Sequence, residues 1–84
     1  MITTTIDLAR YDCRMDRITA ATIYRVESGE WAIGVIYRNR NINGKIICEA
    51  QIGDSGHPNQ YETVDEALEV ANSIGIRTIA VEPH

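Results

Sequence analysis

The stretch TAATIYRVESGEWAIGVIYR, residues 19–38, decides the fold because it contains two runs of alternating side chains on either side of a turn. Alternation with a period of two is typical of a strand that buries one face. The second run, residues 31–38, places four large apolar side chains on one face: Trp31, Ile33, Val35 and Tyr37. Because residues 28–30 (Ser-Gly-Glu) favour a turn, the sequence predicts an antiparallel hairpin.

A third alternating run follows at residues 45–52, and its pattern places these side chains toward the core: Ile46, Cys48, Ala50 and Ile52. The segment before it, residues 39–44, ends in Asn43-Gly44, a pair that tolerates positive φ at both central positions of a tight turn. The sequence therefore predicts a three-strand antiparallel meander.

An amphipathic helix is predicted after the meander and after a loop over residues 53–60. Thr63 with Glu66 three residues later forms a capping box, and the apolar residues then recur at helical spacing: Val64, Ala67, Leu68 and Ala71. Gly75 suits the left-handed position after a helix end. A final strand over residues 76–81 completes an α+β fold.

The first 18 residues carry two competing patterns. Ile2, Thr4, Ile6 and Leu8 alternate as a strand does, whereas Leu8, Tyr11, Met15 and Ile18 recur at helical spacing. We favour a helix over residues 7–17, with the apolar residues on one face and Arg10, Arg14 and Arg17 on the other.

Length and composition set the class of protein. The chain has 84 residues, of which 44% are hydrophobic and 24% charged, as expected of one ordinary folded domain. Isoleucine and valine far outnumber leucine, which favours a sheet over a helical bundle. A domain this small buries a modest core, and oligomerisation is one remedy.

The net charge of −4 is unevenly distributed along the chain. Residues 1–45 carry a net charge of +2, and residues 46–84 carry −6. We expect an acidic contact surface around the helix, formed by these residues: Asp54, Glu62, Asp65, Glu66 and Glu69. A second candidate is the tip of the second hairpin, where Arg38 and Arg40 could contact carboxylates or phosphates.

Residues for catalysis or metal binding are sparse. Cys13, Cys48, His57 and His84 lack the paired spacing of zinc sites, so no metal or cofactor is expected. Cys13 with His57 is the sole catalytic pair we can suggest, and it lacks a third group to orient the histidine. With two cysteines, no signal peptide and no long apolar run, we expect a reduced cytoplasmic protein that does not enter membranes.

Three resemblances follow from these residues. The order helix, three strands, helix is similar to that of a double-stranded-RNA-binding domain, but Asp65, Glu66 and Glu69 would repel phosphates, so no direct nucleic-acid binding is expected. The opening Thr63, Glu66, Ala67 resembles that of small α/β antitoxin domains. In size and acidity the chain resembles the small inhibitor proteins of phages and mobile elements, among them the anti-CRISPR proteins.

These observations predict a protein-binding module and not an enzyme. The resemblance to phage inhibitors implies a small acidic inhibitor of a larger protein or ribonucleoprotein complex. The inhibitor would occupy the basic surface with which that complex handles nucleic acid. The alternative is a structural or regulatory homodimer, antitoxin-like, that pairs sheet faces or edges through Trp31, Tyr24 and Tyr37. A small-molecule enzyme is the third hypothesis.

Overall fold

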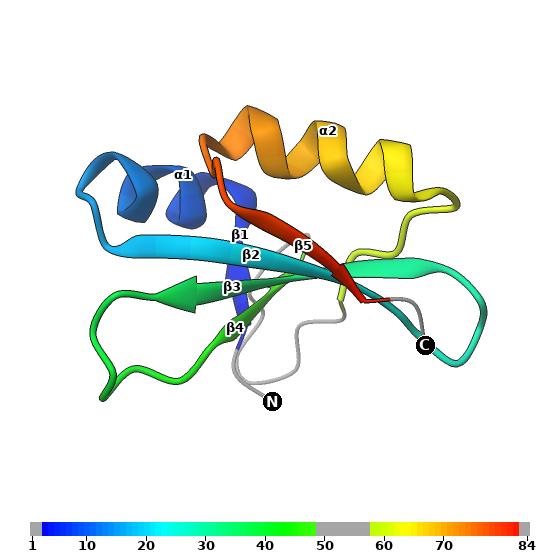
Figure 1. Cartoon of the computed structure of the whole chain (residues 1–84), viewed down its shortest axis with the longest axis horizontal. Coiled ribbons are helices and arrows are strands. Elements are labelled where there is room, and N and C mark those ends of the chain that lie inside the picture. The colour runs from blue at the N-terminus through cyan, green and yellow to red at the C-terminus, as the bar shows by residue number, and fades with distance from the viewer. Residues whose placement is uncertain (1–2, 49–57, 83–84) are drawn as a thin grey trace.

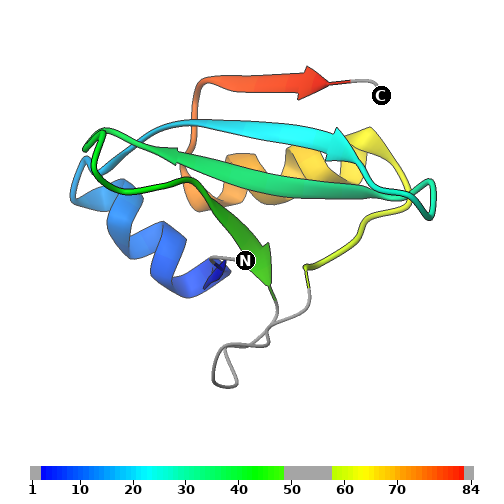
Figure 2. The ribbon, with the colours of Figure 1, turned by 90° about the horizontal axis from the view of Figure 1, so that it is seen from below.

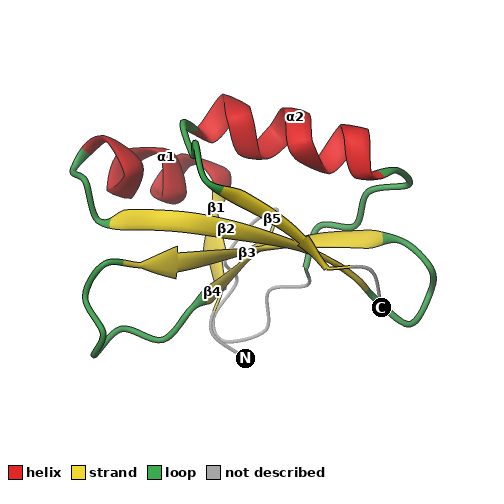
Figure 3. Cartoon of the chain, in the orientation of Figure 1, coloured by secondary structure: helices red, strands yellow, loops and turns green. Residues whose placement is uncertain are grey.

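The computed structural model describes residues 3–48 and 58–82, which form a sheet with two helices packed on it (Figures 1 and 3). The elements, in chain order, are β1 (Thr3–Thr5), α1 (Ile6–Arg14), β2 (Ile18–Arg25), β3 (Trp31–Tyr37), β4 (Lys45–Cys48), α2 (Val64–Ile74) and β5 (Ile79–Glu82). The α+β class predicted from the sequence is confirmed.

The sheet is mixed, with the strand order β1-β4-β3-β2-β5. At its centre, β2 pairs with β3 and β3 with β4 in antiparallel fashion, so the predicted meander is present. The prediction was incomplete at both edges, where β1 pairs with β4 and β5 pairs with β2, each in parallel. Parallel neighbours cannot be joined by a short turn, and here a helix lies on each route between parallel strands.

Both helices lie on the same face of the sheet (Figure 1). The strands β1, β2, β4 and β5 all point the same way, so the chain crosses from β1 to β2 through α1 and from β4 to β5 through α2. Both crossovers travel in the same direction across the sheet. Because crossovers of this kind are nearly always right-handed, both helices are brought to one face. The opposite face is turned toward the viewer in Figure 2, with the helices behind it.

The core lies between this face and the helices. Ile23 on β2 is paired with Ile33 on β3, and Ile47 on β4 lies next to Ile33 because it follows Ile46, the partner of Gly34. All three isoleucines have no exposed surface. The face predicted for Trp31, Ile33, Val35 and Tyr37 is therefore the face that the helices cover.

Helix α2 begins and ends as the sequence predicts. The Thr63 side chain accepts a hydrogen bond from the Glu66 backbone amide at 3.2 Å, and Gly75 ends the helix with a φ of 107°. Ala67, Ala71 and Ile74 form its buried side. The small alanine side chains allow the helix to approach the sheet closely.

The N-terminal segment satisfies both of its competing patterns, as a short strand followed by a helix. The helix is oriented differently from the prediction, because Ala9 is fully buried whereas Leu8, Tyr11 and Met15 are about half exposed. The residues of α1 that face the core form a second apolar set on the other side of the helix: Ile6, Ala9 and Cys13. Small residues are favoured there because α1 packs against both the sheet and α2.

Two predictions about the third strand were wrong. Ile47, not Ile46, belongs to the core, so the inward face of β4 is shifted by one residue from the prediction, although Cys48 is buried as well. Gly44 does not adopt a positive φ; the turn is instead organised by Asn39, whose side chain accepts a hydrogen bond from the Asn41 amide at 3.0 Å. Ala50 and Ile52 lie outside the described residues.

The predicted final strand is present but begins later, at Ile79, and lies at a sheet edge beside β2. The predicted start at Ile76 fails because Ile76 is buried in the connection between α2 and β5. The backbone amide of Ala21 donates to the Thr78 carbonyl at 2.9 Å and so marks where the pairing begins.

Two isoleucines on one strand provide a direct test of which face is buried. Ile33 has no exposed surface and Ile36 is 46% exposed. We expect Ile33→Ala to lower the free energy of unfolding by about 2–5 kcal/mol, because it leaves a cavity in the core. Ile36→Ala serves as the matched control, and equal losses for the two variants in chemical denaturation would contradict the assignment of faces.

Candidate interaction surfaces

The acidic residues of α2 lie on its outer side. Of the predicted contact residues, Glu62, Asp65, Glu66 and Glu69 are all exposed. The spacing of the last three places them on one arc of α2 opposite the buried alanines, and Glu62 lies just before the N-cap residue Thr63. We call these four residues the acidic face. Asp54, the fifth residue predicted for this surface, lies outside the described residues.

The carboxylates of the acidic face have no cationic partner within the described part of the chain. The three ion pairs there join Arg10 to Asp7, Arg17 to Asp12 and Arg38 to Asp16, all in the N-terminal half. The described residues of α2 include no basic side chain. The negative potential of the acidic face is therefore not neutralised by contacts with these residues.

Glu66 differs from the other three because it also stabilises the helix. Its Oε2 accepts a hydrogen bond from the backbone amide of Glu62, the residue before the N-cap, at 3.3 Å, which adds to the cap that Thr63 makes. Asp65 is also in the first turn, where a negative charge interacts favourably with the helix dipole. The side chains of Glu62 and Glu69 make no hydrogen bond or ion pair with the described residues, so the fold does not account for their charge.

The second predicted contact surface, Arg38 and Arg40 at the start of the β3–β4 connection, lies at the other end of the molecule from the acidic face. In Figure 1 the β3–β4 connection is at one end of the sheet, and α2 begins at the opposite end. Arg38 is held by Asp16, whose backbone carbonyl accepts from Nε at 3.1 Å and whose Oδ1 accepts from a guanidinium nitrogen at 2.9 Å. Arg40 is exposed. The structure thus does not bring the two predicted surfaces together.

Tyr37 belongs to the core and not to a contact surface, since only 7% of it is exposed. Its hydroxyl donates a hydrogen bond to Oδ2 of Asp12 at 3.1 Å, which ties α1 to β3. Burial, followed by the effect of the Asp12 carboxylate, raises the pKa of Tyr37 to about 12. The ammonium of Lys45 lies 4.9 Å from the centre of the ring.

Trp31 is half-buried and packs against the core. Its backbone amide and carbonyl both bond to Tyr61 at 2.8 Å, and the guanidinium of Arg25 lies 5.8 Å from its ring. Trp31 and Tyr37 both lie on the side of the helices, and Tyr37 is buried, so Tyr37 is not available for the homodimer predicted through sheet faces or edges. Trp31 stays partly exposed.

Tyr24, the third aromatic residue of that dimer hypothesis, lies on the face of the sheet that the helices leave open. A Cβ at Gly34 would lie 3.8 Å from the Tyr24 ring, which is an ordinary van der Waals distance, so the ring lies over the sheet beside Gly34. Burial raises the pKa of Tyr24. The ring therefore covers part of the open face.

Residues that the sequence analysis did not propose as contacts form an exposed apolar stripe on α1: Leu8, Tyr11 and Met15. Their helical spacing predicts the buried face of the helix, and the structure exposes them instead. A second apolar set has the same spacing in the sequence, Ile6, Ala9 and Cys13, and the small side chains of Ala9 and Cys13 suit close packing against α2. A Cβ at Gly75 would lie 3.4 Å from Sγ of Cys13, which indicates how closely the segments approach.

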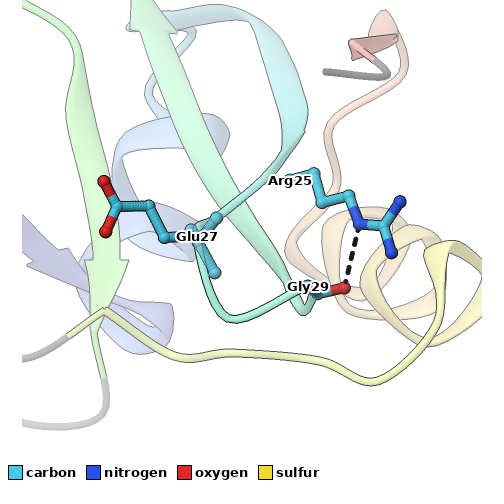
Figure 4. Close-up of a pocket in the computed structure, with 4 residues that line it drawn as sticks. Arg25, Glu27 and Gly29 are labelled. Carbon is cyan, nitrogen blue, oxygen red and sulfur yellow. Dashed lines mark hydrogen bonds between the residues drawn. The ribbon is translucent and has the colours of Figure 1, made fainter.

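Depressions in the surface are open. One of about 360 Å³ lies at the β2–β3 turn, where Nε of Arg25 donates to the Gly29 carbonyl at 3.2 Å and Glu27 points the other way (Figure 4). Another, of about 550 Å³, is lined by Cys13, Arg38 and Arg77 among others. Across the described residues there is no cluster of three potential metal ligands. His57, the suggested partner of Cys13, lies outside them.

Among the residues that the structure describes, no helix combines the length and the apolar character needed to span a bilayer. Comparisons with protein-family models, with curated proteins and with solved structures found no match. The fold is of the α+β class, with a mixed sheet and both helices on one face. The exposed surfaces of this protein therefore carry the evidence for its function.

The Tyr37–Asp12 contact predicts a pH dependence of stability. The pKa of Tyr37 in the folded protein, about 12, lies above the value of 10.0 for an unperturbed tyrosine, so its contribution is complete below pH 10. It is lost as the pH rises from 10 to about 12. We expect Tyr37→Phe to lower the free energy of unfolding by about 2 kcal/mol at pH 7, because a hydrogen bond to a charged acceptor is lost.

Denaturation of wild type and Tyr37→Phe at a series of pH values measures this contribution. The difference between the two proteins should shrink as the pH passes 10, whereas other titrations affect both alike. A difference that stays constant up to pH 12 would contradict the raised pKa.

Proposed function

We propose that this protein is a binding module that acts as an inhibitor, by covering a basic surface on a larger nucleic-acid-handling protein or ribonucleoprotein complex. The acidic face of α2 is the contact surface in this proposal. The observation that carries it is the exposure of four carboxylates, three on the outer side of α2 and one just before its N-cap, with no cation of the described residues paired to any of them.

Electrostatics favours a basic partner for this surface. Unpaired carboxylates repel phosphates, so a nucleic acid is an unfavourable ligand for the acidic face. A protein surface that binds phosphates is itself lined by arginine and lysine, and it attracts an acidic face at long range. Occupying that surface would exclude the nucleic acid without any chemical step.

The position of the acidic side chains supports a role outside the fold. Asp65 and Glu66 assist the start of α2, whereas Glu62 and Glu69 add like charges beside them at a cost in repulsion. Charges that the fold does not require are the ones expected at a contact surface. The small inhibitors that the sequence resembles, phage and anti-CRISPR proteins, provide the model for this role.

A variant that leaves Thr63 and Glu66 unchanged tests the proposal: Glu62→Gln, Asp65→Asn and Glu69→Gln together. Glu66 is kept because it adds to the cap that Thr63 makes. The matched control is Glu27→Gln, Glu30→Gln and Glu82→Gln, which changes the net charge equally at positions outside α2. Immobilised wild type, variant and control are exposed to host-cell lysate at low and at high salt.

We expect wild type and control to retain the same nucleic-acid-handling complex at low salt, and added nucleic acid to compete with that retention. High salt and the α2 variant should both abolish it, since screening and neutralisation remove the same attraction. Mass spectrometry identifies the retained proteins. Equal retention by the α2 variant, or retention that nucleic acid does not reduce, would reject the acidic face as the contact.

A further inference from the structure

The apolar stripe of α1 is exposed in a way that the fold does not explain. Leu8 is 49% exposed, Tyr11 49% and Met15 52%. They recur at positions i, i+3 and i+7, so they lie along one side of the helix for two turns. The opposite side, with Ile6, Ala9 and Cys13, makes the contacts with the core. A helix with two apolar sides has one available for a partner.

Two opposite charges border the stripe symmetrically. Asp7 precedes Leu8 and Arg14 precedes Met15, and their separation of seven residues places both on the same flank of Tyr11. Asp7 contacts Arg10 at 3.3 Å, yet its side chain is 93% exposed and can accept a second cation. Arg14 is exposed and forms no ion pair with the described residues.

We propose that this stripe binds the same stripe of a second copy of the chain, with the two α1 helices antiparallel. A twofold axis beside Tyr11 brings this ring against the partner's Tyr11. The same axis brings Leu8 against the partner's Met15 and Asp7 against the partner's Arg14. Each apolar side chain then meets another apolar side chain, and the Asp7–Arg14 pair forms twice in the dimer.

The self-complementary order of charges is what identifies a second copy as the partner. A parallel twofold arrangement would carry the flank with Asp7 and Arg14 to the far side of the partner helix, so neither charge would meet its opposite. The antiparallel arrangement keeps both charges on the same side and is therefore the favoured one. Arg17, 5.6 Å from the centre of the Tyr11 ring and paired with Asp12, holds that ring in place before association. A restrained ring loses less freedom on binding.

This dimer goes beyond the function proposed for α2, because it uses another helix and leaves the acidic face open. Its contact is two helical turns long in each copy, which is at the small end of protein interfaces. We therefore expect reversible association in the micromolar range.

Sedimentation of the purified full chain across the micromolar range measures the association. Leu8→Glu places a charge in the stripe at a position that is already half exposed, so the fold should be retained, as circular dichroism can verify. Ile42→Glu is the matched control, since Ile42 is 39% exposed in the β3–β4 connection. We expect Leu8→Glu to be monomeric and Ile42→Glu to dimerise like wild type.

Charge reversals test the antiparallel order. Asp7→Arg and Arg14→Glu each place like charges opposite one another in their own homodimers, and we expect each to raise the dissociation constant by about tenfold. When the two variants are mixed, both cross-pairs are opposite in charge. The mixture should therefore form a heterodimer with an affinity close to that of wild type, an outcome that nonspecific apolar association would not produce.

Monomeric wild type throughout this range would overturn the dimer, as would failure of the mixed variants to associate when wild type does. Monomeric wild type that binds vesicles of anionic lipid through Leu8 would overturn it in favour of a membrane surface. None of these outcomes concerns retention by the acidic face, so the two proposals fail separately.

Discussion

The handedness of two crossovers sets the layout of the whole molecule. The chain passes from β1 to β2 and from β4 to β5 in the same direction across the sheet, so α1 and α2 must lie on the same face. A single layer of side chains between sheet and helices then has to provide the core. The adjacent isoleucines at 23, 33 and 47 meet that demand, and each is fully buried.

Two helices on one small sheet must also lie close to each other. Alanine is found at the buried positions 9, 67 and 71, and Cys13 approaches Gly75 at the end of α2. Small side chains on the inner surface reduce the distance between the layers, but they leave the larger side chains of α1 outside. The exposed stripe of Leu8, Tyr11 and Met15 is thus a consequence of the way in which α1 packs.

Charge is divided between the two helices in a corresponding way. Around α1 the acids are paired with arginines, and Asp12 and Asp16 also connect the helix and the turn after it to β3 through Tyr37 and Arg38. On α2 the outer carboxylates have no such partners in the described part of the chain. The molecule therefore offers one surface suited to apolar contact and another suited to long-range attraction, and these support separate proposals.

The sequence by itself determined the local elements: the hairpin from alternation around residues 28–30, and α2 from its capping box and from Gly75. It also identified the acids of α2, because helical periodicity and charge are properties of neighbouring residues. Only the tertiary structure decided the parallel edge strands, the shift by one residue at Ile47, and which side of α1 is buried. These depend on contacts between residues far apart in the chain, where two apolar faces on one helix look equivalent until the close packing against α2 selects the smaller one.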